Sequence, residues 1–367
     1  MWQRIIREWD WILMLSTISL IIIGCIVIGS ATHVNREGLQ LTGLVSKQLL
    51  FFGLNIIAIV GLQWLDYERL RPYAKWIYAA TILMLLAVMI VGTSALGAQR
   101  WIQIGPITIQ PSEFTKLMMI ISLANMLESR VEKLNSFKEL LPVFLFLGIP
   151  ALLVFKQPDL GTSLVYVAIL AGMLFVSGIR MRLVQIMVGT MVALAPLSWF
   201  VLQEYQKQRI MVFLNPNVDP FGAGYHIIQS KIAIGSGLLF GKGLFEGTQS
   251  QLNFLPENHT DFIFSVVGEE LGLLGCCVVL GLLLVVVYRS FLIAKRSVDP
   301  FGMLIATGIG SMFLFEVLVN VGMTTGIMPV TGIPLPFISY GVSALTTNLL
   351  SIGLLLNIVM RQKKRMF

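Results

Sequence analysis

The chain of 367 residues is 56% hydrophobic and only 12% charged, and its mean hydropathy is +0.83. Because soluble domains carry about a quarter charged residues, this composition excludes an ordinary soluble protein and predicts a polytopic membrane protein. The net charge of +7 is compatible with a nucleic-acid partner, but the basic residues lie in short loops between apolar windows. The orientation of a membrane protein explains that placement better, so we expect no nucleic acid.

Ten apolar windows follow one another along the chain, and each can cross about 30 Å of hydrocarbon as a helix. The windows are 11–30, 44–64, 73–92, 112–128, 141–156, 160–178, 183–203, 262–288, 301–325 and 342–360. The fourth and fifth are short and interrupted, which leaves nine or eleven spans as alternatives. We expect an all-α, polytopic integral membrane protein of about ten transmembrane helices in a single domain, 1–367.

The three cysteines, Cys25, Cys276 and Cys277, all lie inside apolar windows. Adjacent side chains point in different directions on a helix, so Cys276 and Cys277 support neither a disulfide framework nor a metal cluster. We expect all three to be small apolar packing residues.

Most of the 26 lysines and arginines fall at the two ends of the chain and in the even-numbered connections between windows. These are Arg4, Arg7, Arg69, Arg71, Lys75, Arg130, Lys133, Lys138, Arg180, Arg182, Arg289, Lys295, Arg296, Arg361, Lys363, Lys364 and Arg365. The positive-inside rule therefore predicts that both termini are cytoplasmic. The remaining basic residues, which include Arg100, Lys116, Arg209 and Lys231, lie on or near the outer side.

The longest connection, about 204–261 between the seventh and eighth windows, is external in this orientation. Connections of this length in compact proteins are usually functional or disordered. Its glycines and the apolar run 227–237 favour an ordered segment that lies at the bilayer surface or dips into it. A disordered loop is the alternative.

The polar stretch Pro256–Asp261 runs directly into the apolar stretch Phe262–Gly272. On a helix, Asp261 would share one face with the small residues Ser265, Gly268 and Gly272, which would let a neighbouring helix approach closely. Asp261 would then lie at the mouth of a cleft between helices.

A carboxylate at the edge of hydrocarbon is costly unless it has a partner or a task. Capping of the next helix by Thr260 or Asp261 is the structural alternative. We expect burial to raise the pKa of Asp261 toward that of a general base, with Glu257 and His259 beside it.

Two further constellations precede the long loop. Glu113 and Lys116 are three residues apart just inside a window, so they can pair on one helix face. We interpret them as part of a polar cavity, with a structural ion pair as the alternative. Asp159 lies in a tight external turn beside Lys156, where an orienting or ligating role and a plain turn are equally supported.

Near the C-terminus, 334–343 combines prolines, hydroxyls and glycine at the entrance of the last window, and it includes Ser343. This composition favours a re-entrant segment that lines a cavity. Glu316 and Asn320 lie one turn apart in the ninth window, and for them we expect a packing role.

Taken together, the outward side collects Asp261, Asp159, Glu113 and several cations. Acidic groups beside cations at the outer mouth of a cavity suit a lipid-linked diphosphate, because cations or a bound divalent ion, Mg²⁺ or Mn²⁺, steady phosphates. A carboxylate can take a proton from an attacking hydroxyl. A proton-coupled transporter would use similar parts.

At these motifs the chain resembles the SEDS family (shape, elongation, division, sporulation) over nearly its whole length. The resemblance rests on Gly97–Trp101, Gln110–Glu113, Gln157–Ser163, Leu255–Gly272 and Ile338–Gly341. The segments Tyr225–Lys231 and Gly247–Gln251 resemble the elongation members more than the division members. One departure is Gly341–Val342, where many members have paired glycines.

The resemblance implies a peptidoglycan glycosyltransferase that polymerises lipid II into undecaprenyl-linked glycan at the outer face of the bacterial inner membrane. It also implies a class B penicillin-binding protein and the elongation machinery as partners. The family's essential aspartate matches Asp261, and its other important positions match Arg100, Glu113, Lys116 and Asp159. The expected substrate or cavity residues are Arg100, Glu113, Lys116, Asp159, Arg209, Lys231, Glu257, His259 and Ser343, and Asp159 and Asp261 are the candidate ligands of a divalent cation.

Two rival functions stay open at this point. The same cavity could flip lipid II across the membrane, because intramembrane charges beside broken helices are also typical of transporters. The chain could instead be a scaffold that positions a cross-linking enzyme.

Overall fold

Each of the ten predicted windows contains a helix in the computed structural model, which describes residues 7–33, 43–95, 98–105, 107–134, 136–200, 202 and 204–362. The helices are α2 (Trp11–Ala31), α3 (Gly43–Leu62), α4 (Ala74–Val91), α5 (Pro111–Glu128), α6 (Phe137–Lys156), α7 (Leu160–Val176), α8 (Met181–Ser198), α12 (Ile263–Arg296), α13 (Pro300–Thr325) and α14 (Val342–Gln362). This confirms the all-α, polytopic membrane architecture. Arg4, Arg36, Gly97, Lys363, Lys364 and Arg365, on which part of the orientation and of the resemblance rests, lie outside the described residues.

Seven of these helices are long and apolar enough to cross a membrane, as judged over the described residues: α2, α3, α4, α6, α12, α13 and α14. The apolar helix α7 is shorter, with 17 residues, and the apolar stretch of α8 is only Met181–Leu194. The helix α5 has 18 residues but is less apolar, because Glu113 and Lys116 lie in its first two turns. By length and hydropathy, α5, α7 and α8 are therefore the helices that least resemble independent membrane spans.

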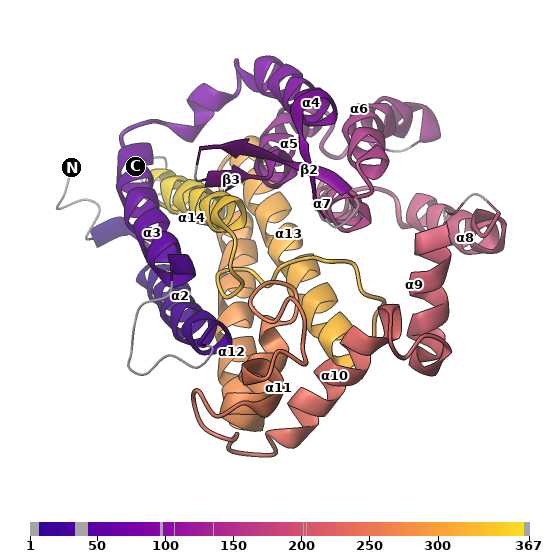
Figure 1. The fold of residues 1–367 in the computed structure, drawn as a ribbon. Helices are drawn as coiled ribbons and strands as arrows, with labels where there is room; N and C mark the ends of the chain where they lie inside the picture. Colours follow the sequence, from indigo (N-terminus) through magenta and orange to yellow (C-terminus); the bar gives the residue numbers. More distant parts are fainter. Residues whose placement is uncertain are drawn as a thin grey trace.

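The helix α13 lies at the centre of the bundle, with α12, α7 and α5 packed around it (Figure 1). Most of its side chains are buried, whereas α3 and α4 expose apolar side chains on their outer faces. A helix that is apolar all round is typical of the interior of a membrane bundle. Residues on α13 are therefore placed to contact several helices at once.

A small antiparallel sheet in the order β1–β2–β3, which was not expected from the amino-acid sequence, connects α4 to α5. Its strands are β1 (Thr93–Ala95), β2 (Ala98–Ile104) and β3 (Ile107–Ile109). Gly105 in the β2–β3 turn has φ +60°, which favours glycine. The strand β2 carries Arg100 to the edge of the bundle.

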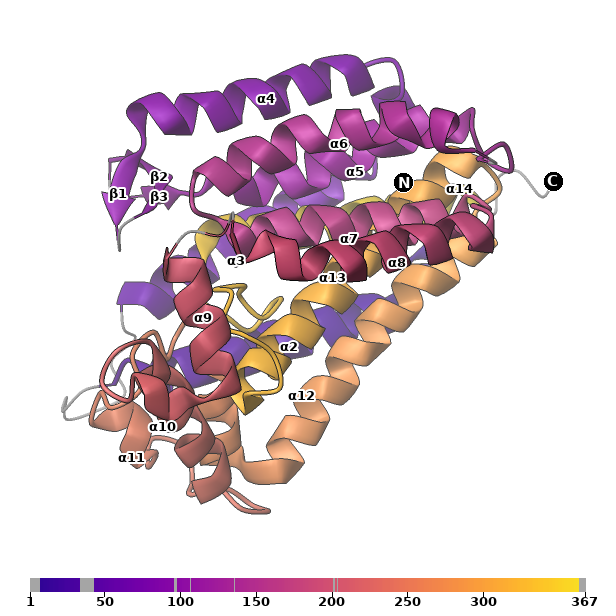
Figure 2. The same cartoon turned by 90° about the vertical axis from the view of Figure 1, so that its right-hand side faces the viewer.

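The long connection between α8 and α12 is ordered and largely helical. It contains α9 (Glu204–Leu214), the short 3₁₀ helix η2 (Pro216–Val218), α10 (Ala223–Ser236) and α11 (Thr248–Gln251). The helix α10 packs against α12 and α13. In Figure 2 this group and the small sheet lie at one end of the helices, and α12 and α14 end at the opposite end.

The helix α12 is broken at Gly272, so the predicted single span 262–288 is wrong at its start. Gly272 has φ 65° and ψ −164°, and a Cβ there would lie 2.3 Å from the backbone nitrogen of Gly241. Beyond the break, the N–H groups of Leu273 and Leu274 donate to the carbonyls of Leu238 and Leu239, at 2.9 and 3.1 Å. The first segment, 263–271, is thus a separate piece of helix, and hydropathy alone cannot reveal a break inside an apolar run.

Candidate active site

Asp261 lies in the turn that precedes α12 and not on the helix itself. The helix begins at Ile263, and its N-cap, Phe262, makes no side-chain capping bond. The expectation that Asp261 shares a helical face with Ser265 is therefore wrong, and neither Thr260 nor Asp261 is the N-cap. The predicted close approach at Gly268 is confirmed, because a Cβ there would lie 3.0 Å from Ile234 of α10.

The main chain of this turn is held by hydrogen bonds from two other segments. The Asn320 Nδ2 group on α13 donates to the carbonyl of Asp261 at 2.9 Å and to that of Ile333 at 2.8 Å. The Ser339 hydroxyl donates to the carbonyl of Thr260 at 2.7 Å, and the Tyr340 N–H donates to the carbonyl of His259 at 2.9 Å.

Asn320 is fully buried and was expected only to pack. In the structure it ties the turn of Asp261 to the segment after α13. The backbone position of the carboxylate is thus fixed before any substrate arrives, which is what a catalytic group requires.

The Asp261 side chain is partly exposed and lies against Gly332. Gly332 has φ +76°, and a Cβ on it would lie 3.3 Å from Asp261 Oδ2, so glycine suits both the backbone and the space. Burial, together with the nearby Glu257 carboxylate, raises the pKa of Asp261 to about 6, although Arg209 and Arg100 oppose the shift. The expected rise in pKa is confirmed.

Glu257 and His259 frame the turn in different ways. The Glu257 Oε2 atom accepts a hydrogen bond from the Thr260 hydroxyl at 2.9 Å. The His259 ring lies 6.0 Å from the Tyr340 ring, centre to centre, and its Nδ1 is 3.3 Å from Asn258 Oδ1. Burial lowers the pKa of His259, with the Glu257 carboxylate opposing, which favours the neutral ring.

Arg100 and Asp159 meet at the turn between α6 and α7. The Arg100 guanidinium donates from Nε to the carbonyl of Gln157 at 3.1 Å, and it also bonds the carbonyl of Pro158. Its NH1 nitrogen lies 3.8 Å from Asp159 Oδ1. One side chain of β2 therefore holds the turn between α6 and α7, which the sequence could not show because 57 residues separate Arg100 from Gln157.

Asp159 is buried and caps α7. Its carboxylate accepts from the N–H and the hydroxyl of Thr162, at 3.2 and 3.0 Å, and lies 3.3 Å from the Ser112 hydroxyl. Both oxygens are thus occupied, which favours the orienting role over the ligating one.

The other residues that were expected at the site lie around Asp261 and Asp159 at different depths. Arg209 on α9 reaches the carbonyl of Thr331, next to Gly332, at 3.5 Å. The Ser343 hydroxyl accepts from the N–H of Gln110 at 2.9 Å and so fixes the entrance of α5. Lys231 is exposed on α10 alongside Gly326, at the end of α13.

Lys116 forms a buried ion triad with two carboxylates. Its Nζ is 2.8 Å from Glu113 Oε2 and 2.6 Å from Glu316 Oε1, and the Lys116 side chain is only 2% exposed. The predicted Glu113–Lys116 pair is confirmed, but the preference for an open polar cavity over a structural ion pair is wrong. Glu316 was expected to pack, and the structure makes it an ionic partner instead, a contact that joins α13 to α5 across 200 residues.

Asp159 and Asp261 do not form a built site for a divalent cation. Among the described residues, no group of three or more His, Cys, Asp or Glu side chains is placed to hold a metal ion. The Asp159 oxygens are already bonded, as described above. The requirement for Mg²⁺ or Mn²⁺ stays a prediction, and we derive no step through a metal.

Comparison with known proteins identifies the family of this chain. A family model for cell cycle proteins of the FtsW, RodA and SpoVE group matches residues 10–364. The chain is 39% identical to the peptidoglycan glycosyltransferase MrdB of Escherichia coli, over 97% of this chain and 96% of that protein. It is 34% identical to the peptidoglycan glycosyltransferase RodA of Treponema pallidum, over 98% and 99% of the two chains.

Two solved structures share the fold. One is a chain from a peptidoglycan synthase complex described as coordinating polymerization and crosslinking, with a TM-score of 0.83 and 30% identity over 97% of this chain and 98% of that one. The other is the rod shape determining protein RodA of Thermus thermophilus, with a TM-score of 0.72 and 31% identity over 96% and 97% of the two chains. Since these matches extend over nearly the whole chain, it belongs to the FtsW, RodA and SpoVE family, the SEDS family that its motifs indicated, and is similar to the RodA members.

Proposed function

We propose that this chain is a peptidoglycan glycosyltransferase that polymerises lipid II at the outer face of the bacterial inner membrane during cell elongation, with Asp261 as the general base. Curated relatives that match over nearly the whole chain bear the name peptidoglycan glycosyltransferase, which supports the reaction class. The main support for the mechanism is the structure around Asp261. Its main chain is held in place by a hydrogen bond, while its partly exposed carboxyl has a pKa of about 6.

In the proposed reaction, the Asp261 carboxylate accepts the proton of the 4-hydroxyl of the acceptor lipid II sugar. The hydroxyl oxygen then attacks the anomeric carbon of the growing chain, and the bond from that carbon to the diphosphate breaks. Undecaprenyl diphosphate leaves with the bonding electron pair. One base and a good leaving group suffice for inversion, whereas retention would need a second carboxylate as nucleophile.

The leaving diphosphate needs positive charge close to Asp261. Arg209 and Arg100 are the two cations whose charges act on the Asp261 carboxyl. Lys116 is not available for this role, since each of its two carboxylate partners would have to be displaced. We therefore assign the diphosphate to Arg209 and Arg100, which replaces the earlier expectation for Lys116.

The partner proposed for this chain is a class B penicillin-binding protein within the elongation machinery. The support is that a structural relative belongs to a peptidoglycan synthase complex that coordinates polymerization and crosslinking. An external helical segment, α9–α11, stands on the same side as Asp261 and offers a surface through which such a partner could act on the turn.

The test is a polymerisation assay on the purified chain with its partner, in detergent. Since a general base contributes about 10²–10⁴-fold, Asp261→Asn should lower glycan formation by at least about a hundredfold. The matched control is Glu246→Gln, an exposed carboxylate of the same external connection, which should leave the rate near that of the unchanged protein. Near-normal polymer from Asp261→Asn would remove Asp261 from the base role.

The same assay separates the rival functions and the metal question. A pure flippase makes no polymer in detergent, where there are no compartments, and a pure scaffold makes none without its enzyme. Parallel reactions with Mg²⁺, with Mn²⁺ and with a chelator would establish whether a divalent cation is needed.

A further inference from the structure

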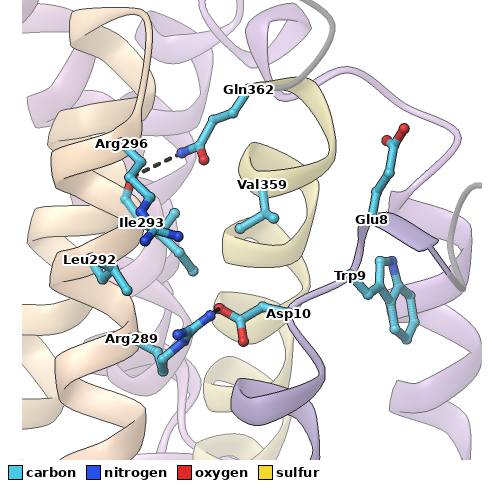
Figure 3. Close-up of a pocket in the computed structure, with 9 residues that line it drawn as sticks. All are labelled: Glu8, Trp9, Asp10, Arg289, Leu292, Ile293, Arg296, Val359 and Gln362. Carbon is cyan, nitrogen blue, oxygen red and sulfur yellow. Dashed lines mark hydrogen bonds and ion pairs between the residues drawn. The ribbon is translucent and has the colours of Figure 1, made fainter.

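A pocket lies at the opposite end of the bundle from Asp261, where α12 and α14 end and α2 begins. It has a volume of about 530 Å³ and is lined by Glu8, Trp9, Asp10, Arg289, Leu292, Ile293, Arg296, Val359 and Gln362 (Figure 3). In the orientation expected from the basic residues, this end faces the cytoplasm. None of these residues belongs to the site described above.

The pocket lies at the level of a membrane boundary. Asp10 is the N-cap of α2, and Arg296 is the last residue of α12. Aromatic side chains gather at the same level, with Trp11 44% and Tyr288 64% exposed beside Trp9 and Arg289. Tryptophan and tyrosine are enriched at the interface between hydrocarbon and headgroups.

The walls and the rim of the pocket have different chemistry. Arg289 and Arg296 are seven residues apart on α12, so they lie on one face about 10 Å apart along the axis. Leu292 and Ile293 lie between them, and Val359 of α14 faces them (Figure 3). The two acidic residues of the lining lie away from Arg296, because Asp10 is bonded to Arg289 and Glu8 stands on the opposite side of the pocket (Figure 3). A volume with apolar walls and an arginine at its rim, at a membrane boundary, fits a phospholipid headgroup with the start of its acyl chains.

One ion pair holds the pocket open. Arg289 contacts Asp10 Oδ2 with two nitrogens, Nε at 2.7 Å and NH2 at 2.5 Å, and so ties α12 to the start of α2. On the other side, the Gln362 amide donates to the carbonyl of Ile293 at 2.9 Å and ties α14 to α12. These two bonds leave the space between the three helix ends unfilled.

Two residues of the lining, Arg296 and Trp9, offer hydrogen-bond donors. Arg296 has an exposed side chain and makes no ion pair with the described carboxylates. The indole Nε1 of Trp9 is buried and finds no acceptor among the described residues, and buried donors in proteins are nearly always paired. Figure 3 shows the Trp9 ring on the side of the pocket opposite Arg296, so the two donors flank the space between them. Donors without a partner favour a ligand that is rich in acceptor oxygens. A phosphodiester supplies such oxygens.

We propose that this pocket binds the headgroup of an anionic phospholipid of the cytoplasmic leaflet, with Arg296 and the Trp9 indole N–H on the phosphate oxygens. Arg289 keeps its bond to Asp10 and contributes charge without releasing its partner. The acyl chains leave along Leu292 and Val359 toward the hydrocarbon. A bound lipid joins the ends of α2, α12 and α14 and so stabilises the cytoplasmic end of α12, whose outer end follows Asp261.

The test measures lipid binding to the full chain in detergent by native mass spectrometry, with phosphatidylglycerol and cardiolipin compared against phosphatidylethanolamine and phosphatidylcholine. Anionic lipids should bind more tightly than the zwitterionic ones. Arg296→Gln should weaken phosphatidylglycerol binding about fivefold, the contribution expected of one basic side chain at the membrane surface. Lys295→Gln is the matched control, because Lys295 is equally exposed but does not line the pocket, and it should change binding less than twofold.

Three outcomes would overturn the proposal. Equal losses from the two variants would show a general surface charge in place of a site. The absence of a preference for anionic lipids would exclude the phosphate contact, and displacement of the lipid by inorganic phosphate at millimolar concentration would identify a plain anion site. Trp9→Phe, which keeps the ring and removes the N–H, gives a second variant that should weaken binding without altering elution or thermal midpoint.

Discussion

Two groups of carboxylates in this membrane domain have opposite surroundings. Glu113 and Glu316 both contact Lys116 and are buried in the middle of the bundle. Asp261 has arginines nearby but no ion pair of this kind among the described contacts, and its side chain is partly exposed beside Gly332. The triad of Lys116 with Glu113 and Glu316 is closed to solvent, and we call it the closed site. The Asp261 carboxyl is partly accessible, and we call it the open site.

The difference shows that residue type and hydropathy do not separate a structural charge from a chemical one. All three carboxylates lie in or at the edge of apolar windows, where charge is costly. The buried pair is stabilised by a cation at contact distance, so it joins helices and cannot exchange its partner without loss. The open carboxylate is fixed through its main chain, so its side chain remains available to a substrate.

The largest expected effect is on the closed site. Lys116→Met should lower the free energy of unfolding by about 3–5 kcal/mol, because it leaves two buried carboxylates without their cation. Thermal unfolding in detergent, with and without lipid, would measure this.

Glu113→Gln is the matched control for that variant, since it leaves one carboxylate for one lysine. It should cost much less than Lys116→Met. If the two variants lose the same stability, the triad is not the closed, charge-balanced contact that the comparison requires.

A smaller effect is expected where the open site is held in place. Asn320→Ala removes both hydrogen bonds to the carbonyls of Asp261 and Ile333. It should cost about 2 kcal/mol of stability and lower the turnover number by about tenfold to a hundredfold, since misplacement of a catalytic group is costly. The apparent KM should change little, because Asn320 is buried and does not contact substrate.

Thr324→Val provides the control for Asn320→Ala, because its hydroxyl bonds only within α13. This variant should keep the turnover number. A turnover number that survives Asn320→Ala would show that the main-chain clamp does not position Asp261.

The smallest effect is a shift in pH dependence. A base with a pKa of about 6 must lose its proton to act, so polymerisation should rise with pH through that value and level off above it. At about pH 5 the rate should be about tenfold below its plateau. Initial rates over a series of buffers of equal ionic strength would show this acid limb.

Neighbouring charges should move the acid limb in opposite directions. Glu257 raises the pKa of Asp261, so Glu257→Gln should shift the limb to lower pH. Arg209 lowers that pKa, so Arg209→Gln should shift the limb to higher pH, each by less than about one pH unit. Shifts of the same sign in both variants would contradict the assignment of the limb to Asp261.

Several features of the molecule could be predicted from the chain alone. Apolar windows of about 20 residues define where membrane helices form, because each backbone polar group in hydrocarbon must be bonded within its own segment. The i, i+3 spacing of Glu113 and Lys116 was enough to pair them, since neighbours on one helix face are set by local geometry. The motif around Asp261 was enough to indicate the residue that the proposed chemistry depends on.

Other features depended on contacts between distant segments. The ion pair between Glu316 and Lys116 could not be predicted, because hydropathy and helical spacing do not show which helices contact each other. The break at Gly272 was hidden inside an apolar run, since it depends on the insertion of the Gly241 backbone and not on local propensity.

The amino-acid sequence by itself thus determined the class of protein, the helices and the acidic residue at the edge of the membrane, because these follow from local composition and periodicity. Only the tertiary structure decided which carboxylate is open to solvent and which is closed, where the turn of Asp261 is anchored, and that a pocket with Arg289 and Arg296 in its lining exists at the far end of α12. The physical reason is that burial, charge pairing and hydrogen bonding of a side chain are set by whatever packs against it, and those neighbours lie far away along the chain, from 59 residues for Asp261 and Asn320 to 279 for Asp10 and Arg289.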